Sequence, residues 1–96
     1  MTPPPSFKFR LFVAGGTPNS VQALGNLKSF CQSHLANLYE IEVVDVFREP
    51  LRALSEGIFM TPTLLKLGPG AAVRIVGTLS DSRVLLQNLG AEANAA

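Results

Sequence analysis

The chain has 96 residues, of which 47% are hydrophobic and 16% charged, and eight Lys and Arg stand against seven Asp and Glu. This length and composition predict one globular domain with a single core and exclude a largely disordered chain. A net charge of +1, without clustered cations, argues against nucleic acid or an anionic membrane as partner. No membrane-spanning apolar run or signal-peptide pattern occurs, so we expect a cytoplasmic protein.

The chain has one cysteine, Cys31, and one histidine, His34. A single thiol excludes an intramolecular disulfide, and no group of thiolates, imidazoles or carboxylates has metal-ligand spacing. We therefore expect no metal and no cofactor. We expect Cys31 to be a core residue and His34 to lie on the surface.

Residues 1–6 are rich in proline and residues 91–96 carry no core pattern, so we expect a disordered lead-in and a frayed tail around a single domain at 7–90. The first element is a strand over residues 7–14, because apolar side chains alternate along it and Gly15 ends it. Its inner half is apolar on both faces, which is typical of a strand that enters the interior.

A helix is expected over residues 18–36. Thr17 is a suitable cap through its hydroxyl, and Pro18 fits the first helical position because its missing N–H costs nothing there. Spacings of three and four predict that one stripe of this helix faces the core. The stripe consists of Val21, Leu24, Leu27, Cys31 and Leu35.

Residues 39–47 predict a second strand, parallel to the first, since the helix supplies the crossover. A short helix over 50–56 follows, with Leu51 and Leu54 facing inward and Gly57 as its stop. The apolar link at 58–60 is expected to be at least partly buried.

Residues 63–67 and 72–76 predict an antiparallel hairpin, because Gly68, Pro69 and Gly70 form a strong turn signal between them. A last helix over 81–89 is expected, with Ser80 as its cap. The predicted order is therefore βαβαββα, which is the thioredoxin-like order.

Thr17 and Ser20 stand where thioredoxins carry their reactive cysteines, and Pro62 lies in the Thr-Pro turn that faces this site in that fold. A hydroxyl does not exchange disulfides, which excludes reductase activity. We interpret Thr17, Pro18 and Ser20 as structural and Pro62 as a candidate cis proline. The alternative is a glutathione-binding or transferase-like protein in which one of these hydroxyls polarises a bound thiol.

Four segments together resemble the KaiB family of bacterial circadian-clock proteins: residues 11–20, 43–46, 61–64 and 75–80. The resemblance implies a non-enzymatic protein that binds the N-terminal ATPase ring of KaiC. In cyanobacterial clocks it also implies sequestration of KaiA and competition with SasA. It further implies two folds, a thioredoxin-like monomer and a βαββααβ ground-state tetramer, which share the chain up to about residue 50.

The chain departs from the family pattern at three places. Gln87, before Leu89, favours helix where family members commonly have a short glycine-containing stretch, so we predict the thioredoxin-like monomer. Glu40 and Glu42 replace small and basic residues and weigh against binding of KaiA. Gly57 replaces a frequent Lys, which we expect to weaken contacts with KaiC.

The resemblance places the partner-binding residues on the second helix and on the edge of the second strand. An adaptor in stress signalling with a different partner stays open as a third hypothesis. The predicted partner-binding residues are Phe7, Tyr39, Glu40, Ile41, Glu42, Leu51, Arg52, Glu56 and Gly57.

Overall fold

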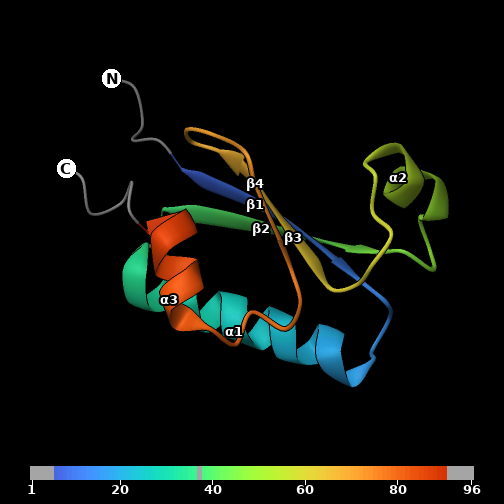
Figure 1. The fold of residues 1–96 in the computed structure, drawn as a ribbon, viewed down its shortest axis with the longest axis horizontal. Helices are drawn as coiled ribbons and strands as arrows, with labels where there is room; N and C mark the ends of the chain where they lie inside the picture. Colours follow the sequence, from blue (N-terminus) through green and yellow to red (C-terminus); the bar gives the residue numbers. More distant parts are fainter. Residues whose placement is uncertain (1–5, 37, 91–96) are drawn as a thin grey trace.

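The computed structural model describes residues 6–36 and 38–90, and Figure 1 shows their arrangement. The observed order confirms the predicted βαβαββα arrangement and differs from the alternative βαββααβ. The expectations for residues 1–5 and 91–96 lie outside the described residues. The elements are β1 (Phe7–Val13), α1 (Pro18–His34), β2 (Tyr39–Asp45), α2 (Pro50–Ser55), β3 (Thr63–Gly68), β4 (Val73–Val76) and α3 (Ser82–Leu85), which continues as a π-helix over Leu86–Gly90.

The four strands form one sheet in the order β2-β1-β3-β4. β1 and β2 are parallel, as predicted from the helical crossover between them, and their register places Arg10 opposite Glu42. β1 and β3 are antiparallel, and β3 and β4 form the predicted hairpin. The turn of that hairpin contains a cis peptide bond between Gly68 and Pro69, which the sequence did not predict.

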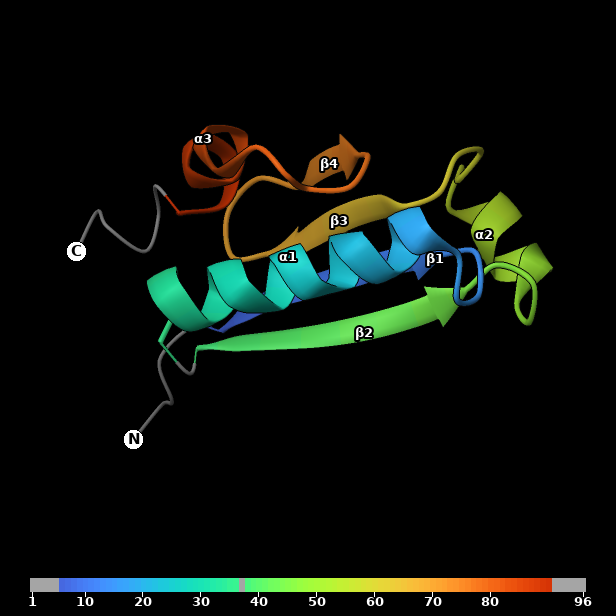
Figure 2. The same cartoon turned by 90° about the horizontal axis from the view of Figure 1, so that it is seen from below.

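The two faces of the sheet carry cores of different size, because alternate residues of a strand point to opposite sides. Phe9 and Leu11 of β1 face the larger core, which α1 and α3 cover, while Phe12 faces a smaller core with Val44 and Ile58. Figure 2 shows α1 lying lengthwise over the sheet, with α2 beyond the far end of the strands. The smaller core therefore leaves α2 with little apolar support.

The helix α1 ends two residues earlier than predicted, at His34, and Ala36 adopts a left-handed φ of 47°. Cys31 and Leu35 are buried as expected, whereas Val21 is 60% exposed. Ser20 and Ala23 face the sheet in its place. These small side chains let the helix approach the strands closely, and Val21, next to Ser20, is thereby turned outward.

The inward orientation predicted for Leu51 and Leu54 is wrong, since their exposed fractions are 79% and 61%. Ala53 is the only buried residue of α2. Residues 52, 53 and 56 share one side of a helix, and residues 51 and 54 lie on the other. The side that meets the sheet carries Arg52 and Glu56, because the sheet offers Arg10 and Glu42 beneath it as partners.

The cap predicted for the last helix is also one residue off. Asp81, rather than Ser80, occupies the cap position, and its carboxylate accepts from the backbone N–H groups of Arg83 and Val84. A carboxylate is the stronger acceptor at a helix start, where the dipole also favours negative charge. Gln87 is exposed and Leu89 is buried in the larger core, so this segment is helical as its composition predicts.

Candidate functional site

The loop between β1 and α1 is closed by two hydroxyl groups. Ser20 Oγ accepts hydrogen bonds from the backbone N–H of Ala14 and from the hydroxyl of Thr17, both over 3.0 Å. Thr17 occupies the predicted cap position, but its side chain makes no cap hydrogen bond, which corrects the expected role of its hydroxyl. Ser20 is 2% exposed. Both hydroxyls hold the loop in shape, and Ser20 is too deeply buried to activate a ligand.

Asp45 ties this loop to the segment after β2, a role that sequence reasoning missed. Its Oδ1 accepts from the backbone N–H of Gly15 over 3.2 Å and from that of Phe47 over 2.9 Å. An Asp that bonds the N–H two residues further on forms an Asx turn, so an acidic residue inside the apolar run of residues 43–47 was the available signal. The bond directs the chain so that Phe47 lies at the surface.

The peptide bond between Thr61 and Pro62 is cis, as predicted. Beside it lies an apolar hollow of about 250 Å³ with no charged group in its lining. This volume is below the range of small-molecule sites and suits one large side chain of a partner protein better than a cofactor. The lining residues are Ala14, Val46, Phe47, Ile58, Phe59, Met60 and Thr61.

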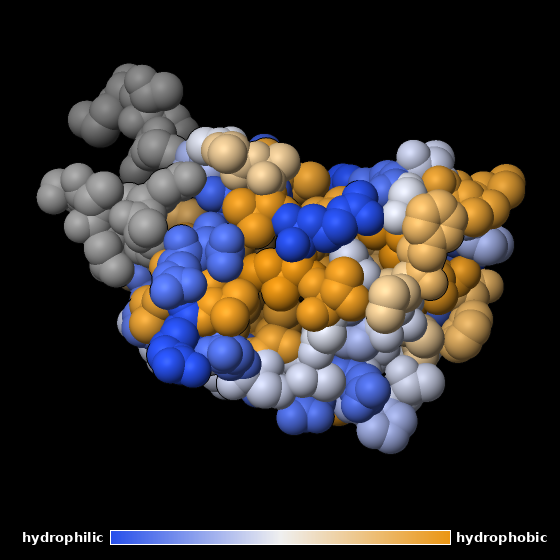
Figure 3. All heavy atoms as spheres, in the orientation of Figure 1, coloured by the Kyte–Doolittle hydropathy of each residue, from blue (hydrophilic) through white to orange (hydrophobic). Residues whose placement is uncertain are grey.

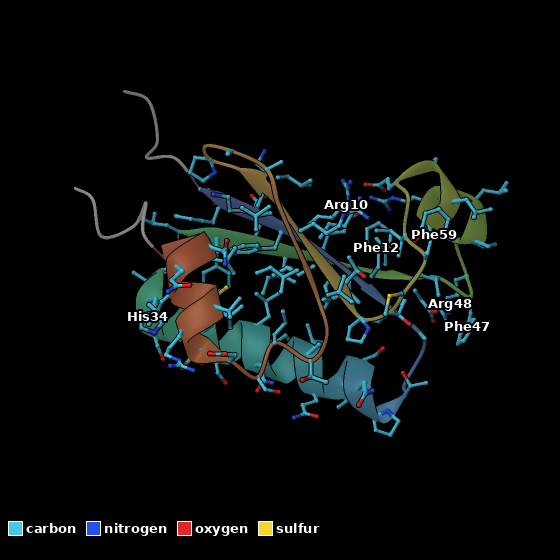
Figure 4. All side chains as sticks on the ribbon, viewed as in Figure 1. Arg10, Phe12, His34, Phe47, Arg48 and Phe59 are labelled. Atoms are coloured by element: carbon cyan, nitrogen blue, oxygen red, sulfur yellow. The ribbon has the colours of Figure 1, made fainter. Side chains whose placement is uncertain are left out.

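Large apolar side chains gather around this hollow and on the outer side of α2, and we call this area the α2 surface. Figure 3 shows them as orange atoms at the right-hand end of the molecule, and Figure 4 shows Phe47 and Phe59 there. Contiguous exposed apolar groups of this kind mark interaction sites on soluble proteins. The α2 surface consists of Phe47 (72% exposed), Leu51 (79%), Leu54 (61%), Phe59 (83%) and Met60 (64%).

Four charged residues form a closed ring between the sheet and α2, and we call it the ion-pair ring. Arg10 contacts Glu42 over 2.8 Å and Glu56 over 2.5 Å, while Arg52 contacts Glu42 over 2.8 Å and Glu56 over 3.4 Å. Hydrogen bonds from Arg10 and then Arg52 lower the pKa of the Glu42 carboxyl, and the bond to Glu42 raises the pKa of both guanidinium groups. These shifts favour the charged forms of Arg10, Arg52 and Glu42.

The end of α2 is held by a further arginine. Arg74 of β4 donates to the backbone carbonyls of Gly57 over 2.9 Å and Glu56 over 3.0 Å. Gly57 has a φ of +70°, which confirms its predicted role as the stop of this helix. The region around α2 thus combines an outer apolar side with an inner charged side.

The structure brings together some predicted partner-binding residues and separates others. Leu51, Arg52, Glu56 and Gly57 all lie on or beside α2, and Glu42 joins them through the ion-pair ring. The prediction for Phe7 is wrong, because this side chain is 5% exposed and belongs to the larger core.

The remaining predicted residues lie on β2, at the edge of the sheet. Tyr39 and Ile41 are partly buried and pack against the larger core, and Glu40 is exposed. Phe47 was missed as a site residue because it was predicted inside the second strand, which ends at Asp45, and Phe59 and Met60 were missed because they follow no helical or strand periodicity. Apolar residues outside any periodic element were the available signal.

In residues 6–36 and 38–90, no group of three or more His, Cys, Asp or Glu side chains could hold a metal ion. The same residues contain no helix long and apolar enough to cross a membrane. Cys31 is buried, and burial raises the pKa of its thiol to about 12. This thiol is protonated at neutral pH and is unsuited to redox exchange.

Fold and site together define a thioredoxin-like domain with a hydrogen-bonded pair of hydroxyls after its first strand and an exposed apolar surface around α2. The N-terminal domain of SasA from Synechococcus elongatus aligns with a TM-score of 0.75 and 22% identity, over 91% of this chain and 83% of that domain. A chloroplastic thioredoxin z aligns with a TM-score of 0.75 and 16% identity, over 95% of this chain and 80% of that one. Both comparisons confirm the predicted fold.

Comparison of the sequence narrows the class of protein further than comparison of the fold does. The KaiB domain matches residues 10–91. The circadian clock oscillator protein KaiB of Synechococcus elongatus is 40% identical over 89 residues, which are 93% of this chain and 87% of that protein. The KaiB of Prochlorococcus marinus strain SARG is 41% identical over 87 residues, which are 90% and 74% of the two chains. The chain belongs to the KaiB family.

Proposed function

We propose that this chain is a non-enzymatic clock-type regulatory protein that binds the KaiC ATPase ring, or a KaiC-like ATPase, through its α2 surface. The observation that carries the proposal is the exposure of five large apolar side chains around α2 in a chain whose relatives are named clock oscillator proteins. Burying one such side chain in an interface contributes about 1.5–3 kcal/mol, so the five together contribute a gross free energy large enough to offset much of the cost of association.

The ion-pair ring supports the same choice of surface. Because Arg52 and Glu56 turn toward the sheet, Leu51 and Leu54 are left on the outer side of α2. Apolar side chains next to satisfied charges resemble the centre of an interface with its polar rim.

The test is binding to hexameric KaiC from Synechococcus elongatus, measured by gel filtration and by fluorescence anisotropy of the labelled chain. We expect the wild-type chain to co-elute with the hexamer. Leu51→Ser combined with Leu54→Ser is expected to weaken binding at least about tenfold, since each leucine contributes more than about 1.4 kcal/mol when buried.

Val21→Ser is the matched control, because Val21 is 60% exposed on α1 and lies outside the α2 surface. It is expected to bind like the wild type. Absence of a complex between the wild-type chain and KaiC in every phosphorylation state contradicts the proposal. Equal affinity of the double variant and the control contradicts the choice of surface.

The proposal includes a monomer in the thioredoxin-like fold as the binding form. The helical state of residues 82–90, with Leu85 and Leu89 in the larger core, supports it. Sedimentation velocity is expected to give a monomer, and NMR shifts are expected to give helix over these residues. A tetramer with strand over 82–90 contradicts this part of the proposal.

The proposal does not extend to KaiA or to glutathione. The carboxylate of Glu42, on the strand edge predicted for KaiA, is bound by Arg10 and Arg52 and is not free to select a partner. Glutathione would need an available hydroxyl, whereas Thr17 and Ser20 bond to one another. We expect no amide shifts at these two residues when glutathione is added.

A further inference from the structure

The α2 helix has little apolar support beneath it. Ala53 is its only buried residue, and the core on that side of the sheet has three other buried members, Phe12, Val44 and Ile58. A helix of six residues is unstable by itself, because nucleation costs more than its few hydrogen bonds return. Hydrophobic burial alone therefore does not account for the position of α2.

The ion-pair ring joins two strands to the helix. Arg10 and Glu42 are neighbours across β1 and β2, and Arg52 and Glu56 stand one turn apart at α2. Each sheet residue contacts the helix residue of opposite charge, and each helix residue contacts the other. Charge alternates around the ring, so no like charges are adjacent and the pairs reinforce one another.

The ring is partly buried where Arg10 meets Glu56, whereas its bonds to Glu42 are exposed. The side chains of Arg10 and Glu56 are 23% exposed, that of Arg52 is 31% exposed and that of Glu42 is 47% exposed. Isolated exposed pairs contribute little, whereas networks with short contacts and partial burial are screened less by water and salt.

We propose that the ion-pair ring, with Arg10 at its base, is the positioning device that holds α2 on the sheet and presents Leu51 and Leu54 to a partner. Arg10, on β1 beneath α2, acts on the partner only through the position of α2. The expected effect on partner binding rests on the function proposed above. The expected effect on the position of α2 does not depend on that function.

Hydrogen exchange in this chain without a partner tests directly whether the ring keeps α2 on the sheet. The reporters are the amide groups of Ala53, Glu56 and Gly57, which bond to the carbonyls of Glu49, Arg52 and Leu54. We expect Arg10→Glu with Glu42→Arg to speed exchange at these amides at least about tenfold, because both contacts to α2 become repulsive. Amides in the centre of α1 are expected to keep the wild-type rate.

Reversal of all four charges is the matched control. Because Arg52 also contacts Glu49 over 3.5 Å, Arg10→Glu, Glu42→Arg, Arg52→Glu and Glu56→Arg are combined in a Glu49→Gln background, where they rebuild the alternating ring with opposite signs, and α2 exchange is expected to return to within about threefold of that background. Arg10→Gln is a milder variant, expected to speed α2 exchange several-fold, and it serves if the double reversal does not fold. Unchanged α2 exchange in the folded Arg10 variant, or failure of the fourfold reversal to restore it, overturns the proposal.

The KaiC assay separates this proposal from the proposed function. Arg10→Gln is expected to weaken KaiC binding about fivefold or more without altering the exchange of α1. If the wild-type chain does not bind KaiC, the proposed function fails while the exchange experiment still decides the role of the ring. If Arg10→Gln loosens α2 but binds KaiC as the wild type does, the presenting role is overturned.

Discussion

The hydroxyl of Thr17 donates a hydrogen bond to Ser20 Oγ over 3.0 Å, at the two positions that the sequence predicts to correspond to the reactive cysteines of thioredoxins. The same oxygen accepts from the backbone of Ala14, at the end of the strand that leads into the loop. The pair therefore replaces a reactive centre with a structural one. The domain keeps the thioredoxin-like scaffold, and the recognition surface that we propose lies elsewhere, around α2.

Ser20→Ala is expected to destabilise the chain by about 1–2 kcal/mol, because the partly buried backbone N–H of Ala14 loses its acceptor. Urea unfolding followed by circular dichroism measures the loss. Thr17→Ala is the matched control and is expected to cost under about 1 kcal/mol, since Thr17 is exposed and makes no cap hydrogen bond. A larger loss for Thr17→Ala than for Ser20→Ala would contradict the assignment of Ser20 as the centre of the loop.

The alternation of apolar residues was enough to predict the strands and the larger core. Phe9 and Leu11 of β1 are buried in the larger core as their period predicts. The orientation of α2 was not predictable in the same way, because two leucines three residues apart fit an inward or an outward side equally well. The direction of the two leucines depends on Arg10 and Glu42, which lie on other elements, β1 and β2, and attract the charged side of the helix.

The residues around α2 were only partly predictable, because some of them meet only through the tertiary fold. Gly57 and the cis bond at Pro62 have local sequence signals, a glycine after a helix and a Thr-Pro turn before a strand. Phe47 and Phe59 lie in irregular segments, where periodicity carries no information about burial. Only the folded chain shows that the two segments meet around one hollow.

Two glycines are expected to respond to Ala in opposite directions. Gly57→Ala is expected to cost about 1 kcal/mol or more, because its φ of +70° is unfavourable for any residue with a Cβ atom. Gly25→Ala is expected to stabilise the chain by about 0.5–1 kcal/mol, since Gly25 lies inside α1 and a Cβ atom there meets nothing within 4 Å. Thermal and urea unfolding of both variants give the signs.

The cost at Gly57 is expected to be conformational rather than steric, because the nearest atom to an added Cβ is an Arg74 nitrogen at 3.8 Å. Gly57→Asn separates the two causes, since Asn tolerates a left-handed φ better than Ala does. Asn is therefore expected to cost less than Ala at this position. A greater cost for Asn would show that space, not φ, limits residue 57.

Burial of Cys31 is expected to make stability depend on pH in alkaline solution. The pKa of its thiol is raised from 9.0 to about 12, so the contribution of this thiol to the free energy of unfolding is fully present below pH 9.0. Above that value the unfolded chain loses the proton while the folded chain keeps it, and stability falls until about pH 12. At about pH 10 the loss is expected to be on the order of 1 kcal/mol relative to neutral pH.

Cys31→Ala is the control, because it removes the thiol and keeps every other group that titrates in alkaline solution. The difference in unfolding free energy between the wild type and Cys31→Ala is expected to shrink as the pH rises above the ordinary thiol value. Parallel curves for the two proteins across this range would contradict the raised pKa. A thiol reagent applied near neutral pH is expected to modify Cys31 only at the rate of unfolding.

Ile58→Ala tests how the smaller core and α2 depend on each other. Ile58 is 6% exposed, belongs to the core with Phe12 and Ala53, and bonds through its amide to the carbonyl of Ala53. We expect a global loss of about 2–5 kcal/mol and, in addition, faster hydrogen exchange at the α2 amides under native conditions. The second effect arises because Ile58 supports the C-terminal end of α2.

Leu64→Ala is the matched control for this effect, since Leu64 is 1% exposed in the larger core under α1. It is expected to cost a similar global free energy, about 2–5 kcal/mol, without selective loosening of α2. Native-state exchange at low urea distinguishes selective opening of α2 from global unfolding, because the rate of local opening responds weakly to denaturant and that of global unfolding responds strongly. Selective α2 exchange in Leu64→Ala, or its absence in Ile58→Ala, would show that α2 is coupled to the larger core instead.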